Sequence, residues 1–264
     1  MLISYYKNQF IDSDEIQLNQ NLLRGIGVFE TIKFSKNKLF FFDEHINRLL
    51  SNDFFDFTKL KKEKIYDNVI KLIKQNSIQE GLVKIIITPK SNDWNNLEYY
   101  IFLRKLPKIN QDVVKVIFYQ ENLYPILRFN PMYKSLSYMG NFMASRDARL
   151  EGAFEPIFYN QNNIITEGSI RNIFFIKENI IYTPCTKLGI LNGITRQKVI
   201  ELGQSKNYKV DTSPIPFKNI NSMDEAFITS SAIGILPCKW NGWNSDFTVT
   251  KKLKNLYNSM SENQ

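Results

Sequence analysis

Strand-like and helix-like segments alternate from the start of the chain, and this alternation is what most limits the folds that the sequence can adopt. The segments 28–34 and 38–42 have the composition of two strands joined by a polar turn. Apolar residues then recur at helical spacing over 59–76, and strands are predicted again at 83–88 and 98–103. No stretch comes close to the roughly 18–20 apolar residues of a membrane span. The first part of the chain therefore predicts a mixed α and β fold.

A polar, proline-containing segment at 107–112 lies between two strand-like runs, and we interpret it as an interdomain linker. The chain then has an N-terminal domain at 1–106 and a C-terminal domain at 113–264. Short strands are predicted in the second domain, with one helix over 195–207 and a last helix over 248–260. The fold class that follows is α+β, with a small N-terminal α/β domain and a larger C-terminal domain rich in short strands.

Histidine and cysteine are almost absent, since His45 is the only histidine and Cys185 and Cys238 are the only cysteines. Histidine metal clusters, cysteine zinc sites and Ser-His-Asp triads are therefore excluded unless His45 itself is the base, and no metal site is expected. The scarcity of cysteine and the lack of a signal-like N-terminus predict a cytoplasmic protein. A catalyst made from this chain has to use lysine, carboxylates, hydroxyls and backbone amides, or a bound cofactor.

Three blocks in the second half of the chain fall in register with one another, at 167–174 (EGSIRNIF), 181–183 (IYT) and 191–196 (LNGITR). This pattern resembles the signature of the class IV aminotransferases, which are pyridoxal-phosphate enzymes of fold type IV. The chain resembles the family's other recurring blocks, in the same order, at 24–31, 45–49, 133–137 and 225–231. The resemblance implies the two-domain fold of fold-type IV enzymes, like that of D-amino-acid aminotransferase, with pyridoxal 5'-phosphate as the cofactor.

By this resemblance Lys134 forms the Schiff base with the cofactor, and Glu167 lies against the pyridine nitrogen and keeps it protonated. A lysine can do this only when part of it is neutral, so its surroundings must lower its pKa from about 10.4. A carboxylate next to a buried pyridinium stabilises both charges. Taken alone, Lys134 fits a solvated lysine and Glu167 a glutamate at a strand end, but their common register with the signature favours the catalytic interpretation.

The phosphate of the cofactor needs several donors and compensating positive charge. The resemblance points to Arg48, to the backbone N–H groups of Ile194 and Thr195 where a predicted helix begins, and to the hydroxyl of Ser231. The turn before Ile194 is also compatible with an ordinary helix cap. His45 comes three residues before Arg48 on the same helical face, and we expect a structural role for it.

Substrate contacts are predicted for Thr31, Tyr133, Trp94 and Ala232. Tyr133 directly precedes Lys134, and Ala232 follows a run of small hydroxyl residues. For the two aromatic residues, packing in a core is the alternative.

Within the family, Thr31 resembles a threonine of the 4-amino-4-deoxychorismate lyases that assists proton transfer during the loss of pyruvate, whereas branched-chain enzymes usually carry glycine there. The hypothesis is a lyase of folate biosynthesis that releases pyruvate and p-aminobenzoate, with Lys134, Glu167 and Thr31 as catalytic residues. Lys134 removes a proton from the carbon that bears nitrogen, and Thr31 or Lys134 returns one to make pyruvate. An aminotransferase acting on branched-chain or D-amino acids with 2-oxoglutarate is the alternative, and a binding protein on a degenerate enzyme fold is less favoured.

The net charge of +8, from 34 Lys and Arg against 26 Asp and Glu, invites a polyanionic partner. The densest cluster of cations lies on the polar face of the helix predicted at 59–76, however, and no aromatic residues interleave with a basic motif. We therefore expect a small-molecule amino substrate and no nucleic-acid or membrane partner. The resemblance also implies a homodimer.

Overall fold

The computed structural model describes residues 2–16, 19–53, 55–90, 93–124 and 133–262 of the chain. The chain divides into two compact units. The first comprises Met1–Pro107 and Tyr133–Ser137, and the second comprises Lys108–Met132 and Tyr138–Gln264. The segment Tyr133–Ser137, which the boundaries expected from the sequence put in the second domain, thus belongs to the first unit.

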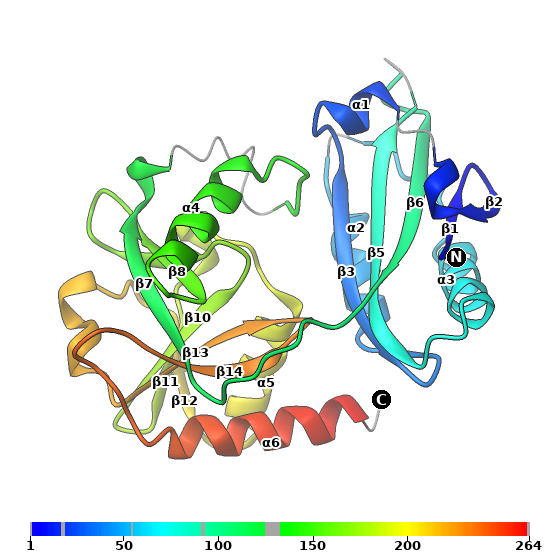
Figure 1. The fold of residues 1–264 in the computed structure, drawn as a ribbon. Coiled ribbons are helices and arrows are strands. Elements are labelled where there is room, and N and C mark those ends of the chain that lie inside the picture. Colours follow the sequence, from blue (N-terminus) through cyan, green and yellow to red (C-terminus); the bar gives the residue numbers. More distant parts are fainter. Residues whose placement is uncertain (1, 17–18, 54, 91–92, 125–132, 263–264) are drawn as a thin grey trace. The chain divides into compact units, whose positions relative to one another are not determined.

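The first unit is built on a six-stranded antiparallel sheet with the strand order β2-β1-β6-β5-β3-β4 (Figure 1). Its strands are β1 (Ile3–Tyr6), β2 (Gln9–Asp12), β3 (Val28–Ser35), β4 (Lys38–Leu39), β5 (Glu80–Pro89) and β6 (Leu97–Arg104). Its helices are α1 (Gln20–Leu23), α2 (Phe42–Leu49) and α3 (Lys62–Gln75), with a 3₁₀ turn, η1 (Ser13–Glu15).

Strand β3 shows why the two faces of this sheet differ. Its even-numbered residues from Val28 to Phe34 are buried and its odd-numbered residues are half-buried, as the alternation of side chains along a strand requires. Val28, Ile32 and Phe34 join one core with apolar residues of α2 and α3, so the helices cover this face. Phe29 belongs to a separate cluster on the opposite face.

The strand predicted over 38–42 is too long. β4 ends at Leu39, and α2 begins at Phe42. Phe41, with φ of 57°, adopts the left-handed conformation at the N-cap of α2, and this turns the chain out of the sheet. The uniformly apolar run at 39–42 has no period that could reveal the change from strand to helix.

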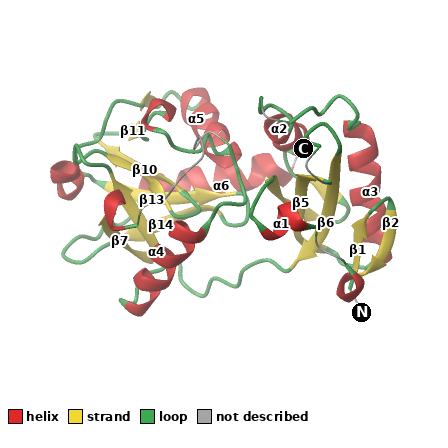
Figure 2. Cartoon of the chain, turned by 90° about the horizontal axis from the view of Figure 1, so that it is seen from above, coloured by secondary structure: helices red, strands yellow, loops and turns green. Residues whose placement is uncertain are grey.

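The second unit contains an eight-stranded mixed sheet with the strand order β12-β11-β10-β13-β14-β7-β8-β9. Figure 2 labels five of its strands, β11, β10, β13, β14 and β7. Its strands are β7 (Val114–Gln120), β8 (Glu155–Tyr159), β9 (Ile165–Gly168), β10 (Asn172–Lys177), β11 (Ile180–Tyr182), β12 (Lys209–Asp211), β13 (Glu225–Ser230) and β14 (Gly234–Lys239). Its helices are α4 (Met139–Leu150), α5 (Ile194–Ser205) and α6 (Thr248–Glu262), with 3₁₀ turns η2 (Glu121–Leu123), η3 (Thr186–Leu188) and η4 (Phe217–Ser222).

The centre of this sheet is buried on both faces. β10 and β13 carry almost no exposed side chain, and the rings of Phe174 and Phe227, which face each other across the two strands, stack with centroids 4.8 Å apart. Helix α5 packs against β12 and β13, α6 against β13 and β14, and α4 against β8. Within the part of the chain that the structure describes, no helix has both the length and the apolar character needed to cross a membrane.

Candidate active site

The residues predicted to form a site fall into two groups, one in each unit. The first unit contains Thr31, Arg48, Trp94, Tyr133 and Lys134, and the second contains Glu167, Ile194, Thr195, Ser231 and Ala232.

Lys134 is attached to the edge of strand β3 by backbone hydrogen bonds, although about a hundred residues separate the two in the sequence. The N–H of Phe29 donates to the carbonyl of Lys134 at 2.9 Å, and the N–H of Leu136 donates to the carbonyl of Gly27 at 3.0 Å. Between them, Val28 and Ser135 form an antiparallel bridge. The Nζ of Lys134 consequently lies 4.6 Å from the centre of the Phe29 ring.

A second lysine, Lys84 of β5, lies over the same ring, with its Nζ 4.6 Å from the ring centre. Lys84 is the direct cross-strand neighbour of Thr31, so their side chains share the sheet face that carries Phe29. Burial lowers the pKa of Lys84, and the positive charges of Arg104 and Lys134 lower it further. Lys84, opposite the hydroxyl-bearing Thr31 on a partly buried face, is a suitable partner for a carboxylate ligand.

Lys84 is not among the site residues that the sequence predicts. The signal was present, because a single lysine interrupts the apolar run LVKIII that predicts a strand at 83–88. A charged residue in the middle of a largely buried strand needs a partner or a function.

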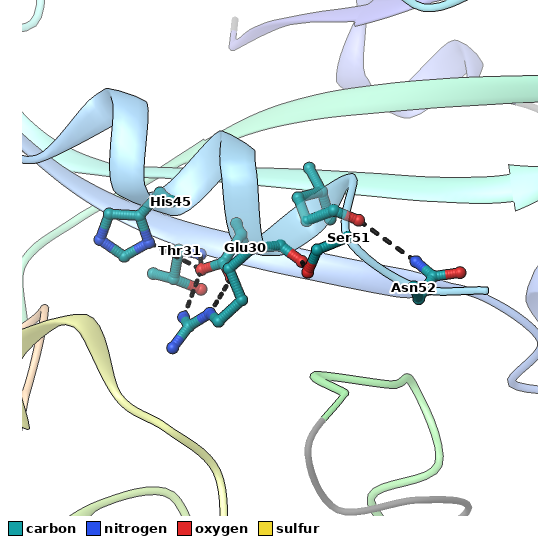
Figure 3. Close-up of polar contacts among 7 residues, drawn as sticks. Glu30, Thr31, His45, Ser51 and Asn52 are labelled. Carbon is teal, nitrogen blue, oxygen red and sulfur yellow. Dashed lines mark hydrogen bonds and ion pairs between the residues drawn. The ribbon is translucent and has the colours of Figure 1, made fainter. Parts of the chain in front are cut away.

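On the helix-covered side of β3, Glu30, His45 and Arg48 form a compact polar group. Figure 3 labels Glu30 and His45 of this group. The carboxylate of Glu30 accepts hydrogen bonds from Arg48 Nε at 2.6 Å and Arg48 Nη2 at 2.8 Å, and its Oε2 lies 2.7 Å from His45 Nδ1. Burial opposes ionisation of Glu30, but the charge of Arg48 and the contact with His45 outweigh it, so the pKa of Glu30 is lowered. Arg48 is thereby fixed in orientation by a buried anion.

His45 is almost completely buried, at 1% exposure. Burial lowers the pKa of its imidazole, Glu30 opposes this effect, and the charges of Arg48 and Lys134 reinforce it. A buried histidine whose lowered pKa favours the neutral form, and whose Nδ1 contacts the Glu30 carboxylate, fits the structural role expected for it from the sequence.

In the second unit, Glu167 lies near the end of β9 and is 7% exposed. Its Oε2 accepts hydrogen bonds from Asn172 Nδ2 and from the N–H of Leu191, each at 3.2 Å. Asn172 Nδ2 also donates to the carbonyl of Leu191 at 2.9 Å. Asn172 therefore joins the turn after β9 to the loop before α5, and these contacts orient the Glu167 carboxylate.

The N-terminus of α5 lies against the same asparagine. A Cβ on Gly193, the N-cap residue, would lie 2.1 Å from Asn172 Oδ1, so a larger residue at this position requires Asn172 to move. No side chain caps the helix in the described structure, and Ile194 and Thr195 begin it with their backbone N–H groups. Such a helix start is a ready-made site for an anion.

The end of β13 borders this helix start. Thr229 of β13 is the cross-strand neighbour of Asn172, and its buried Oγ1 has no hydrogen-bond partner among the residues that the structure describes. Ser231 and Ala232 follow in the half-buried turn between β13 and β14. The register of β10 with β13 thus brings Ser231 toward the same end of the unit as Glu167 and the start of α5.

Arg196 is the last residue of the signature, but the sequence did not predict a role for its side chain. It is buried, its Nη1 donates to Asn192 Oδ1 at 3.0 Å, and its Nη2 donates to the carbonyl of Pro184 at 2.9 Å. Burial lowers its pKa, whereas Cys185 and Glu167 act to raise it. Arg196 braces the loop whose Leu191 N–H donates to Glu167.

Two predicted substrate residues have other neighbours. The ring of Trp94 is about half exposed and lies 5.6 Å from that of Phe55, and the hydroxyl of Tyr133 donates to Asp53 Oδ2 at 3.4 Å. These contacts place Trp94 beside Phe55 and Tyr133 beside Asp53, in the first unit. Their roles toward a substrate stay predictions.

Comparisons with known proteins identify the family of the chain. The family described as amino-transferase class IV matches residues 27–240. A Methanocaldococcus jannaschii protein, provisionally named branched-chain-amino-acid aminotransferase, is 28% identical over 251 residues, covering 88% of this chain and 85% of its own. The aminodeoxychorismate lyase of Bacillus subtilis is 28% identical over 252 residues, covering 88% and 84%. The D-alanine aminotransferase of Listeria monocytogenes is 29% identical over 231 residues, covering 81% and 77%.

A solved structure matches over nearly the whole chain. The branched-chain aminotransferase of Thermoproteus uzoniensis superposes with a TM-score of 0.85 at 22% identity, covering 98% of this chain and 94% of its own. The mixed α and β fold expected from the sequence is confirmed as the fold-type IV architecture.

Proposed function

The chain belongs to the class IV aminotransferase family, and within this family we propose that it is a pyridoxal-phosphate lyase that converts 4-amino-4-deoxychorismate to p-aminobenzoate and pyruvate. Lyase and aminotransferase relatives have nearly the same identity to this chain, so identity alone does not choose between them. The observation that carries the proposal is the position of Thr31, directly across from Lys84 and two residues from the Phe29 ring on which Lys134 lies.

The residues present suit pyridoxal phosphate. The uncapped start of α5, with Gly193 packed closely on Asn172 before it, and the buried hydroxyl of Thr229 offer polar groups for a phosphate. We propose that the N–H groups of Ile194 and Thr195, the hydroxyl of Ser231 and the guanidinium of Arg48 bind it. Glu167, oriented by Asn172 and Leu191, is the candidate partner of the pyridine nitrogen.

When bound, the cofactor supplies an electron sink for the substrate carbon that bears nitrogen. Lys134 is the candidate both to hold the cofactor and to take the proton from that carbon. Lys84 binds a carboxylate of the substrate and keeps the leaving group on the Phe29 face of the sheet. Thr31, whose hydroxyl lies on that face, delivers a proton to the methylene carbon of the departing enolpyruvyl group, which becomes the methyl group of pyruvate.

The test is a product assay on the purified protein with pyridoxal phosphate added. We expect p-aminobenzoate and pyruvate in equal amounts from 4-amino-4-deoxychorismate, and no amino transfer from branched-chain or D-amino acids to 2-oxoglutarate. Transfer in the second assay without product in the first would overturn the lyase assignment. A protein that takes up no pyridoxal phosphate would overturn the cofactor assignment as well.

An aminotransferase acting on branched-chain or D-amino acids is the second candidate, and Lys84 is the observation that supports it. A cation beside Lys134 serves the carboxylate of an amino acid as well as that of a chorismate derivative. The same two assays separate the reactions.

Two further proposals follow from the lyase assignment. Because p-aminobenzoate is a building block of folate, the reaction belongs to folate biosynthesis. We also propose a homodimer, and light scattering of the purified protein should give twice the 31.0 kDa mass of one chain.

A further inference from the structure

A second buried carboxylate, that of Glu155 at the start of β8, lies outside the residues assigned above. Glu155 is 1% exposed, and its Oε1 accepts hydrogen bonds from Ser169 Oγ and from the N–H of Ile170, each at 3.0 Å. Its Oε2 pairs with Nη1 of Arg171. One carboxylate thus binds three consecutive residues of a single turn.

This turn, Gly168–Arg171, joins Glu167 to Asn172. Its backbone is closed by a hydrogen bond from the Gly168 N–H to the Arg171 carbonyl at 2.7 Å. A Cβ on Gly168 would lie 2.6 Å from Glu155 Oε1, so the carboxylate occupies the space that a side chain would need. Because Asn172 in turn donates to Glu167, the shape of the turn determines where the two side chains meet.

Helix α4 holds the turn from the other side. Asn141 Nδ2 donates to the carbonyl of Ser169, and the hydroxyls of Ser145 and Ser169 lie 2.6 Å apart. Ser169 is therefore fixed by both its backbone and its side chain, between α4 and Glu155.

The ion pair between Glu155 and Arg171 contributes little net stability, because burying two charges costs desolvation free energy that offsets their attraction. The side chain of Arg171 is only 9% exposed and lies over the Phe154 ring, and its buried Nε has no hydrogen-bond partner among the described residues. Replacing such a pair with apolar residues is often neutral or stabilising, so the pair adds little to stability that packing could not supply. What it does supply is a fixed backbone between Glu167 and Asn172.

We infer that Glu155 and Arg171 are positioning residues, which set the geometry of the Gly168–Arg171 turn and through it the orientation of Glu167. The inference rests on the proposed role of Glu167 toward the cofactor. Neither residue contacts the reacting atoms, and both act through the turn.

The test compares Arg171→Met and Arg171→Lys with Arg146→Met, which removes an arginine from the exposed ion pair with Asp147 on α4. Hydrogen exchange of the peptide that spans the turn is measured with and without added pyridoxal phosphate. In Arg171→Met we expect at least about tenfold faster exchange there, and in Arg171→Lys partial recovery. Arg146→Met should leave that peptide unchanged.

The second readout is the absorption of the bound cofactor as a function of pH. We expect Arg171→Met to shift the absorption maximum or its pH midpoint and to lower kcat about tenfold with little change in KM. A folded Arg171→Met protein with unchanged exchange and absorption would overturn the inference. If that variant does not fold, Ser169→Ala, which removes one hydroxyl and no charge, is measured in the same way and decides the question.

Glu167→Gln separates this inference from the proposed function. If Glu167→Gln changes the absorption and Arg171→Met does not, the positioning role is wrong and the role of Glu167 stands. If Glu167→Gln leaves the absorption unchanged, the proposed role of Glu167 fails, and the inference that depends on it fails too.

Discussion

The carboxylate of Glu30 accepts two hydrogen bonds from the guanidinium of Arg48, at 2.6 and 2.8 Å, on the helix-covered face of β3. The next residue, Thr31, faces the opposite side, beside Lys84. Because side chains alternate between the two faces of a strand, β3 places the buried carboxylate of Glu30 on one face and the hydroxyl of Thr31 on the other.

Glu30→Ala should destabilise the protein strongly. Removing one partner of a buried ion pair leaves the other charge uncompensated, at a cost of roughly 3–5 kcal/mol in the free energy of unfolding. Urea denaturation measures this cost. Lys62→Ala, which breaks an exposed pair with Asp43, is the control and should cost less than about 1 kcal/mol. Equal small losses in both variants would show that the Glu30 contacts do not hold Arg48.

Stability should fall as the pH is lowered through about 6.5, the ordinary pKa of histidine. Burial lowers the pKa of His45 in the folded chain, so below that pH the unfolded chain binds a proton that the folded chain does not, and unfolding is favoured. The slope can reach about 1.4 kcal/mol per pH unit. Because His45 is the only histidine, His45→Asn should flatten the curve between about pH 5.5 and 7, as measured by urea unfolding. A slope that persists in His45→Asn would refute this assignment.

Lys84→Met should weaken substrate binding. If Lys84 pairs with a substrate carboxylate, its loss removes a charge-assisted hydrogen bond worth about 1.5–3 kcal/mol, which is roughly a 10–150-fold rise in KM. Lys71→Met is the matched control, because Lys71 also lies over an aromatic ring, that of Phe10 at 4.7 Å, but on α3. An unchanged KM in Lys84→Met would remove Lys84 from the site.

Thr31→Val should lower kcat about a hundredfold or more in the lyase assay, because general acid–base assistance by a positioned group typically contributes 10²–10⁴-fold. Thr31→Ser keeps the hydroxyl and should retain most of the activity. Steady-state kinetics on 4-amino-4-deoxychorismate make the comparison. If Thr31→Val is as active as Thr31→Ser, the proton comes from another group and Lys134 is the remaining candidate.

The sequence predicted the type of most helices and strands, because the spacing of apolar residues is a local property. It also predicted the family, because the blocks of the signature lie within 30 residues of one another. It could not reveal that Lys134 lies along β3, since that pairing joins segments about a hundred residues apart. Lys84 was overlooked for a related reason. A lysine within an apolar run marks the position as unusual, but its place over the Phe29 ring together with Lys134 depends on pairing between distant segments.

Gly193→Ala should disturb the candidate cofactor site more than its small size suggests. The new methyl group would lie 2.1 Å from Asn172 Oδ1, so Asn172 must move, and its bond to Glu167 moves with it. We expect a weaker affinity for pyridoxal phosphate, by about tenfold, together with lower stability. A fluorescence titration and a urea unfolding curve measure the two effects.

Gly152→Ala is the control for the glycine substitution itself. Its φ of 71° makes alanine unfavourable by roughly 1 kcal/mol, but a Cβ there meets nothing within 4 Å, so only stability should fall. If Gly193→Ala binds pyridoxal phosphate as tightly as Gly152→Ala does, Asn172 has no part in forming the site. If only Gly193→Ala loses affinity, the contact between α5 and Asn172 links the helix start to the carboxylate of Glu167.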